Sequence, residues 1–174
     1  VLWREAGFLG EAERASQWRL QGFDALSARA WREMGVQSAD EARLWLEHGF
    51  PAEEAKSWIL AGISAETAQE LAALKVAPAE TWVAEFAPDR QRGWRENGFH
   101  VSDAVAWLRT GFDLWEALHW RRHHFLPDIA VAWANKDHLL GPFRFDPVEA
   151  RAWVDAAVKT PKEAMRLAEC GLLS

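Results

Sequence analysis

The stretch Ser38-Ala39-Asp40-Glu41-Ala42-Arg43-Leu44-Trp45-Leu46-Glu47-His48-Gly49-Phe50 decides the fold, because its pattern recurs about every thirteen residues along the chain. Ala42 lies three residues before Trp45, and Gly49 and Phe50 follow four and five residues after it. A motif restated through a whole chain is typical of stacked-repeat architectures. Thirteen residues correspond to Trp45 and define what we call the Trp position: Trp3, Trp18, Trp31, Trp45, Trp58, Leu71, Trp82, Trp94, Trp107, Trp120, Trp133, Trp153 and Leu167.

The residues around each Trp position predict one short helix per repeat. Side chains that cap helix starts lie seven residues before it, and prolines or acids, which suit the first turn, come next. The glycine four residues after it can end a helix, and the apolar residue that follows, which we call the anchor, can pack back on the last turn. The capping candidates are Asp24, Ser38, Ser64, Asp113, Asp146 and Thr160.

Alanine and tryptophan three residues apart give each predicted helix a narrow apolar stripe. A helix of about ten residues is marginal alone in water, so we expect its neighbours to cover this stripe. The alternative, an exposed aromatic ladder that stacks bases or prolines, is less favoured because tryptophan shares its face with alanine and the anchor. The sequence therefore predicts an all-α fold: an α-solenoid or superhelical stack of about 13 short helices, joined by Gly-Phe-type three-residue turns.

The spacing divides the predicted solenoid into two lobes. Residues 1–76 hold regular repeats, residues 77–93 are irregular and contain two Ala-Pro steps that break helices, and residues 94–174 resume the rhythm. An insertion at 138–146 lengthens one link of the second lobe. We expect residues 77–93 to form a bend.

The second lobe carries apolar residues outside the usual stripe, which predicts that its helices are covered on a second side. The apolar side chains of the insertion are the expected cover, and otherwise they form an exposed patch for a partner. The residues off the stripe are Val105, Leu108, Leu114, Trp115, Leu118, Ile129 and Val131, and those of the insertion are Leu139, Leu140, Phe143 and Phe145.

Composition narrows the class of protein. The 174 residues contain a single cysteine, Cys170, which excludes an internal disulfide and a multi-cysteine metal site. No apolar run approaches the roughly 20 residues that span a bilayer, and no leader opens the chain, so we expect a soluble protein of the cytoplasm or another intracellular compartment, without a membrane partner. The chain begins and ends inside a repeat, and we expect it to be an excerpt of a longer protein or assembly.

Charge is distributed unevenly along the chain. Residues 1–87 hold 14 acids and 8 bases, a net of −6, whereas residues 88–174 hold 12 of each. A nucleic acid backbone requires a basic track, which the first half lacks. A nucleic-acid-associated module would therefore use the second half, through Arg90, Arg92, Arg95, Arg109, Arg121 and Arg122.

A histidine cluster is the best candidate for a metal site. His119 and His123 are four residues apart on one predicted helix, a spacing that can bind a metal, and Asp137 and His138 follow one repeat later. The glutamate of a metalloprotease motif is absent, however, and histidine also suits the negative end of a helix. A solvated helix end is the favoured interpretation.

Partner contacts are predicted at residues that the repeat does not explain. Trp115 is the one tryptophan outside the Trp position, and Arg121 and Arg122 form a small basic cluster. Phe143 and Phe145 are the bulky apolar residues of the insertion. These five residues are the predicted partner-binding candidates.

No phosphate-binding glycine loop, nucleophile triad or recognisable carboxylate pair is found, so we expect neither an enzyme nor a cofactor. The preferred hypothesis is a scaffold that binds a protein or extended peptide. The alternatives are a nucleic-acid-associated helical module, or a helical region that serves an enzyme elsewhere in the parent chain.

The pattern Ala-x-x-Trp-x-x-x-Gly-Phe, as in Ala42 to Phe50 and Ala104 to Phe112, resembles tandem single-helix repeats in uncharacterised bacterial proteins. Those repeats often open with a Ser-Pro-Glu-Glu-Ala-like sequence, to which residues 50–55 come closest. The resemblance covers nearly the whole chain and implies a helical-repeat fold without an established activity.

Overall fold

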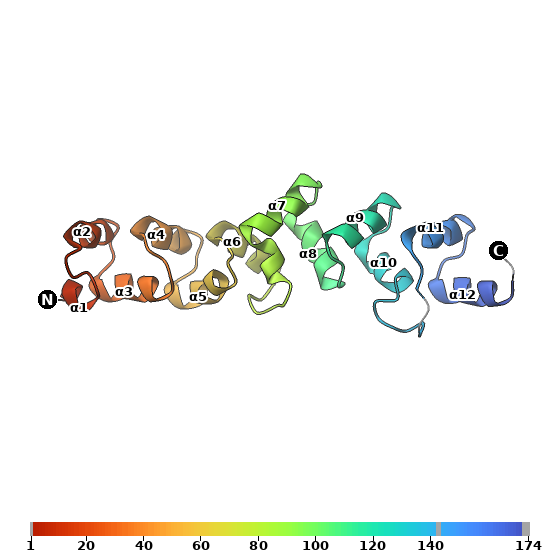
Figure 1. Ribbon diagram of the computed structural model, residues 1–174, viewed down its shortest axis with the longest axis horizontal. Helices are drawn as coiled ribbons and strands as arrows, with labels where there is room; N and C mark the ends of the chain where they lie inside the picture. Colours follow the sequence, from red (N-terminus) through yellow and green to blue (C-terminus); the bar gives the residue numbers. More distant parts are fainter. Residues whose placement is uncertain (1, 142–143, 172–174) are drawn as a thin grey trace. The chain divides into compact units, whose positions relative to one another are not determined.

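The computed structural model describes residues 2–141 and 144–171, and all regular structure within them is helical. This confirms the predicted all-α stack of short helices (Figure 1). The elements are α1 (Leu2–Glu5), α2 (Ala12–Leu20), α3 (Ala25–Glu33), α4 (Ala39–Glu47), α5 (Ala52–Leu60), α6 (Ala65–Ala73), the 3-10 helix η1 (Val83–Phe86), α7 (Pro88–Glu96), α8 (Val101–Arg109), α9 (Leu114–Arg122), α10 (Pro127–Trp133), α11 (Pro147–Asp155) and α12 (Pro161–Glu169).

Every Trp position except Trp82 lies within one of the α-helices, and the repeat at Trp82 does not form an α-helix. Trp82 precedes the four-residue 3-10 helix η1. Pro78 and Pro88 flank this repeat closely, and proline is incompatible with the interior of a helix, so only a short tight turn forms between them.

Side-chain caps begin the helices as the sequence predicts. The Ser38 hydroxyl accepts a hydrogen bond from the Glu41 N–H at 3.2 Å. In α9 the Asp113 carboxylate accepts from the Glu116 N–H at 2.8 Å, while the Glu116 carboxylate accepts from the Asp113 N–H at 3.1 Å. These bonds satisfy amide groups that have no partner inside the helix. All six predicted capping residues are observed as caps, at Asp24, Ser38, Ser64, Asp113, Asp146 and Thr160.

The helix ends also follow one design, which α4 illustrates. Gly49 has φ of +89°, and its N–H donates to the Leu46 carbonyl at 3.0 Å. The N–H of the anchor Phe50 donates to the Trp45 carbonyl at 2.9 Å. This pair of bonds is the Schellman motif, which turns the chain sharply out of the helix. The link to the next helix is therefore short and geometrically fixed.

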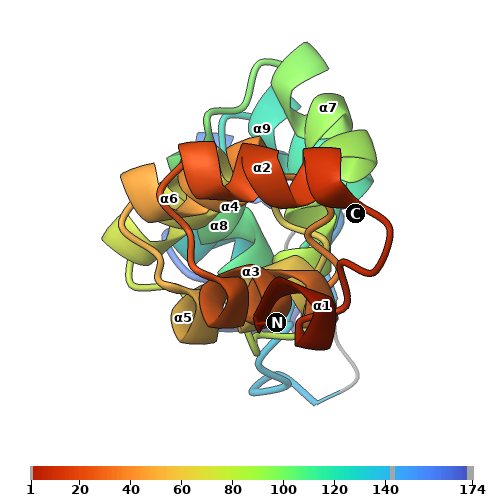
Figure 2. The ribbon, with the colours of Figure 1, turned by 90° about the vertical axis from the view of Figure 1, so that its left-hand side faces the viewer.

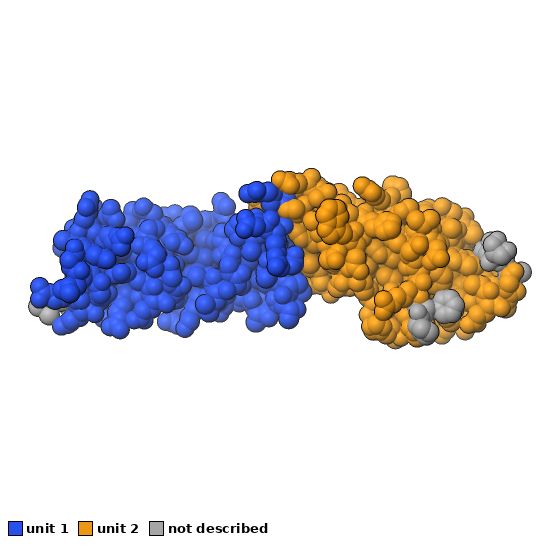
Figure 3. Space-filling view, viewed as in Figure 1, with its two compact units in different colours: residues 1–92 blue, residues 93–174 orange. Residues whose placement is uncertain are grey.

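The chain divides into two compact units, residues 1–92 and 93–174 (Figure 3). The division lies within the range 77–93 that was predicted as a bend. In the first unit, α1, α3 and α5 form one layer and α2, α4 and α6 form the other (Figures 1 and 2). In the second unit, α9 and α11 alternate with α8, α10 and α12 in the same way (Figure 1). No helix of the described residues combines the length and the apolar character that a membrane span requires.

The predicted apolar stripe forms the core of both units. Eight tryptophans at the Trp position are between 1% and 4% exposed, and Trp3, Trp82 and Trp153 are half-buried. The small alanines allow neighbouring backbones to approach closely, and the large tryptophans fill the remaining space. Nine alanines that precede the Trp position by three residues are 0% exposed: Ala28, Ala42, Ala55, Ala68, Ala104, Ala117, Ala130, Ala150 and Ala164.

The anchors connect consecutive helices through aromatic contacts. The Phe50 ring lies edge-on to Trp45 of its own repeat, at 5.8 Å between centroids, and to Trp58 of the next repeat, at 6.3 Å. Such T-shaped pairs add about 0.5–1.5 kcal/mol beyond the burial of apolar area. The anchor therefore joins two helices as well as ending one.

A second contact joins α3 to the end of α1, the next helix but one in the same layer. Arg32, at the end of α3, donates to the Gly7 carbonyl at 3.1 Å, and its guanidinium lies 4.4 Å from the ring centroid of the anchor Phe8. The carbonyl and the ring face are both favourable partners for a cation. We call this arrangement the cation clamp.

The apolar residues outside the usual stripe of the second unit are only partly covered. Val105 and Leu108 are buried, at 3% and 7% exposure, whereas Trp115 is 75% exposed and Ile129 is 51% exposed. Leu139 of the insertion is 81% exposed and covers neither of them. The prediction that the insertion covers all of these residues is therefore wrong for Trp115 and Ile129, which lie on the surface.

Candidate functional site

The insertion starts where α10 ends early. The Asn135 N–H donates to the Ala132 carbonyl and the Lys136 N–H donates to the Val131 carbonyl, so the helix closes two residues sooner than the repeat predicts. Asn135 has φ of +52°, a left-handed conformation that asparagine tolerates better than most side chains. The seven-residue helix α10 follows from this early closure.

The buried side chain of Asn135 then holds the loop together. It is 0% exposed, accepts a hydrogen bond from the Leu140 N–H at 2.9 Å, and donates to the Gly141 carbonyl at 2.8 Å. The Asp137 carboxylate also accepts from the Leu139 N–H, at 3.3 Å. A fully satisfied buried amide fixes a local conformation, and Asn135 therefore organises the first half of the loop.

At Phe145 the chain resumes the contacts that are typical of the repeat. The Phe145 N–H donates to the Trp133 carbonyl at 3.2 Å, and its ring lies edge-on to Trp133 at 5.3 Å between centroids. It is only 7% exposed. Phe145 thus occupies the place of the anchor, and its prediction as a partner contact is corrected, because its own chain buries it. Phe143, the other predicted contact of the insertion, lies outside the described residues.

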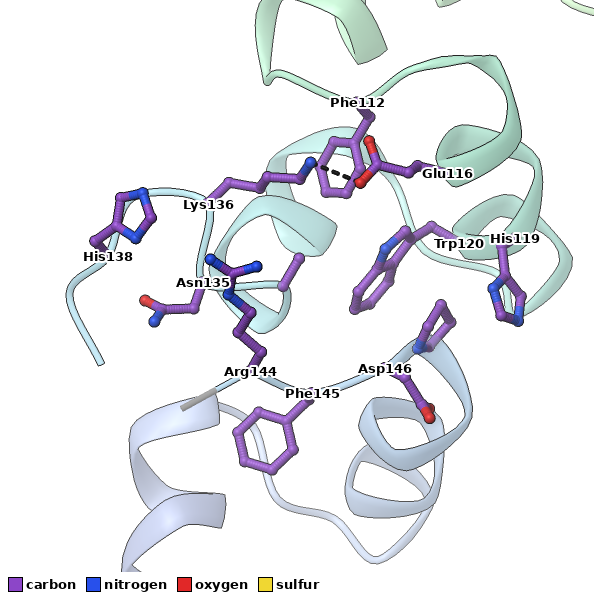
Figure 4. Close-up of a pocket in the computed structure, with 12 residues that line it drawn as sticks. Phe112, Glu116, His119, Trp120, Asn135, Lys136, His138, Arg144, Phe145 and Asp146 are labelled. Carbon is purple, nitrogen blue, oxygen red and sulfur yellow. Dashed lines mark hydrogen bonds and ion pairs between the residues drawn. The ribbon is translucent and has the colours of Figure 1, made fainter. Parts of the chain in front are cut away.

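A pocket of about 440 Å³ lies between α9, the end of α10, the insertion and the start of α11 (Figure 4). We call it the insertion pocket. Its size falls in the range of small-ligand sites. It is lined by Phe112, Glu116, His119, Trp120, Ala134, Asn135, Lys136, His138, Arg144, Phe145, Asp146 and Pro147.

Most of the charged groups in the pocket already have partners. Lys136 donates to the Glu116 carboxylate at 2.7 Å and to the Gly111 carbonyl at 3.0 Å, and its ammonium lies 4.8 Å from the Phe112 ring centroid. Asp146 accepts two N–H groups at the start of α11. Lys136 thus forms a cation clamp from the loop, and both acids of the pocket are neutralised or capped.

Arg144 differs from these groups. It is exposed, and no ion pair or hydrogen bond of its guanidinium is found among the described residues. In Figure 4 its side chain extends from the insertion toward Asn135 and Lys136. The pocket therefore contains one cation that the surrounding described residues leave uncompensated.

The four candidate metal ligands do not come together. His119 and His123 are adjacent, with 5.6 Å between ring centroids. His138 lies at the opposite side of the insertion pocket from His119 (Figure 4), and Asp137 is engaged in the loop. Within the described residues no three histidine, cysteine, aspartate or glutamate side chains are grouped closely enough to hold a metal. The candidate grouping of four ligands is thus not formed among the described residues.

The two predicted arginines have different roles. Arg121 donates to the Gly98 carbonyl at 3.0 Å and lies 4.4 Å from the Phe99 ring centroid, which repeats the cation clamp of the first unit. Arg122 lies on another side of α9, seven residues after Trp115 and three after His119. This spacing places Trp115, His119 and Arg122 on one side of the helix. We call these three residues the α9 face.

Sequence reasoning missed Asn135, Lys136 and Arg144, which build the pocket together with the anchor. A signal for Asn135 was present, because asparagine two residues after a Trp position can end a helix in place of glycine. Nothing in the sequence indicated that Arg144 would lack an internal partner.

No family model, curated protein or solved structure matches this chain.

Proposed function

We propose that this protein is a non-catalytic helical-repeat scaffold that mediates protein–protein or peptide interaction. The tryptophans at the Trp position and the anchors pack neighbouring helices together. Stacked helical repeats commonly present extended surfaces to their partners. The sequence offers no nucleophile or phosphate-binding motif that would favour catalysis.

The exposure of Trp115 carries the proposal. All twelve tryptophans belong to the described residues, and eleven of them are buried or half-buried, whereas Trp115 is 75% exposed. An exposed indole gains no core packing, and tryptophan is strongly enriched among the residues that dominate binding energies. Trp115 shares the α9 face with His119, which lines the insertion pocket, so the two features form one continuous candidate surface.

The nucleic-acid alternative has less support. Arg121 is engaged with the Gly98 carbonyl and Phe99, and Arg90 forms an ion pair with Glu85 at 2.6 Å. At least two of the six arginines that such a module would use therefore already have partners within the protein.

A peptide selection tests the proposed function. The purified protein is presented with a phage library of random dodecapeptides, and the enriched peptides are measured by isothermal titration calorimetry. We expect a shared sequence pattern, with the affinity reduced at least tenfold in Trp115→Ala because a central indole is lost. The matched control is Leu60→Ala, which removes an apolar side chain that is 75% exposed in the other unit.

Absence of any enriched pattern would contradict a peptide-binding scaffold. Equal affinities for the wild type and Trp115→Ala would show that the α9 face is not the binding surface.

A further inference from the structure

We propose that the insertion pocket binds an acidic side chain of a peptide partner, with Arg144 as its counter-ion. The inference rests on the proposed peptide-binding function and names the chemistry that its pocket recognises.

The surroundings of Arg144 favour an anion beside its guanidinium. Glu116 is paired with Lys136, and the Asp146 carboxylate is held by the backbone N–H groups of Val148 and Glu149. Arg144 has no corresponding partner among the described residues that line the pocket. A guanidinium can donate two parallel hydrogen bonds to one carboxylate, so a carboxylate is the group that best completes this arrangement.

The walls of the pocket favour an anion that is attached to an apolar segment. Phe112, Trp120, Phe145 and Pro147 line the pocket although their neighbours cover most of each side chain, and the volume of about 440 Å³ exceeds what a bare ion occupies. A glutamate or aspartate beside an apolar residue matches both the charge and the walls.

The position of the pocket favours a peptide over a free small molecule. His119 belongs both to the pocket lining and to the α9 face, which places the exposed Trp115 one helical turn away. An extended chain that crosses the pocket can therefore place its carboxylate beside Arg144 while another, apolar residue of the same chain contacts Trp115. A free anion would leave Trp115 uncovered.

Two peptide pools test the assignment. Fluorescein-labelled decapeptides carry one fixed glutamate flanked by randomised positions, and the matched pool carries glutamine instead. Binding is measured by fluorescence polarisation at constant ionic strength. We expect the glutamate pool to bind wild type at least tenfold more tightly than the glutamine pool, and Arg144→Gln to abolish this preference, because a charge-assisted bidentate contact is lost.

The control variant is Arg95→Gln, which removes the same charge from an exposed arginine of α7 that does not line the pocket. It should keep the full preference for glutamate. Circular dichroism and thermal unfolding should show the same fold for both variants, because both side chains lie on the surface.

Three results would overturn the assignment. Equal binding of the two pools would exclude carboxylate recognition, while the peptide scaffold would survive if selected peptides still depend on Trp115. Equal losses in Arg144→Gln and Arg95→Gln would show general charge attraction. Displacement of the glutamate pool by millimolar inorganic phosphate, dependent on Arg144, would identify a free-anion site instead.

Discussion

The link after Trp45 and the link after Trp133 end on the same contact, although one is much longer. In the first, the Phe50 N–H donates to the Trp45 carbonyl at 2.9 Å, and the rings lie at 5.8 Å and 77°. In the second, the Phe145 N–H donates to the Trp133 carbonyl at 3.2 Å, and the rings lie at 5.3 Å and 74°. The repeat therefore constrains the contact between tryptophan and anchor rather than the length of chain between them.

The comparison shows where this repeat protein tolerates change. Lengthening a loop costs little free energy when its two ends keep their contacts. The loop after Trp133 closes its helix early at Asn135 and buries Phe145 as the anchor, so it creates a pocket without opening the core. We infer that new surface is added to this fold in the links, while the tryptophans and alanines stay fixed.

The largest effects should come from the Trp position in both regions. Trp45→Ala and Trp133→Ala should each reduce the free energy of unfolding by about 3–5 kcal/mol, because each removes a buried aromatic side chain and leaves a cavity. Urea denaturation measures the loss. A reduction below about 1 kcal/mol at either site would mean that its indole does not support the core.

The anchors provide the sharper test of the comparison. Phe50→Ala and Phe145→Ala should be similarly destabilising, by about 3 kcal/mol, since both rings are buried against a tryptophan. Denaturation of both variants under the same conditions measures the two losses in the free energy of unfolding. If Phe145→Ala cost less than about 0.5 kcal/mol, Phe145 would be a loop residue and not an anchor.

Substitutions at two helix ends should change the stability by smaller amounts and in opposite directions. Gly49 has φ of +89°, and Ala157, at the same place after Trp153, has φ of +65°. Gly49→Ala should destabilise by about 1 kcal/mol, and Ala157→Gly should stabilise by a similar amount, because alanine is strained in this conformation. Thermal unfolding of both variants checks the signs. A stabilising Gly49→Ala would contradict the observed helix end.

The cation clamps should contribute least. Lys136→Met keeps most of the apolar stem but removes the bonds to the Gly111 carbonyl and Glu116, and should cost about 0.5–1 kcal/mol because the pair is partly exposed to water. The difference from wild type should shrink in 1 M salt, where exposed charges are screened. A salt-independent loss would point to packing rather than charge.

The helical fold could be predicted from the sequence because every local signal agreed. Caps such as Ser38, helix-ending glycines such as Gly49 and the buried Ala42 and Trp45 all indicate one helix of the same length and the same buried face. Among the described repeats, that at Trp82 lacks an α-helix because closely spaced prolines leave a 3-10 helix, and α10 ends early.

The candidate site could be predicted only in part. Trp115 does not fit the repeat pattern in the sequence, and it is exposed in the structure. Phe145 was predicted as a partner contact but is an anchor, because the sequence does not show that its N–H returns to the carbonyl of Trp133 after a long loop. The internal contacts of Arg121 were also not predicted, since its partners Gly98 and Phe99 lie two repeats earlier in the chain. Contacts between distant repeats depend on how the helices stack, and the periodicity of the sequence alone does not specify this stacking.

Removal of the insertion tests the central claim most directly. Deleting residues 137–143 and replacing Arg144 with glycine brings Phe145 to the fifth place after Trp133, where Phe50 stands after Trp45. We predict that this variant unfolds in one cooperative transition, with a free energy of unfolding within about 1 kcal/mol of wild type, because shortening the loop leaves the anchor contact intact. Loss of cooperative unfolding in the second unit, or destabilisation comparable to that of Trp133→Ala, would contradict the claim that the anchor contact and not the loop holds the repeat together.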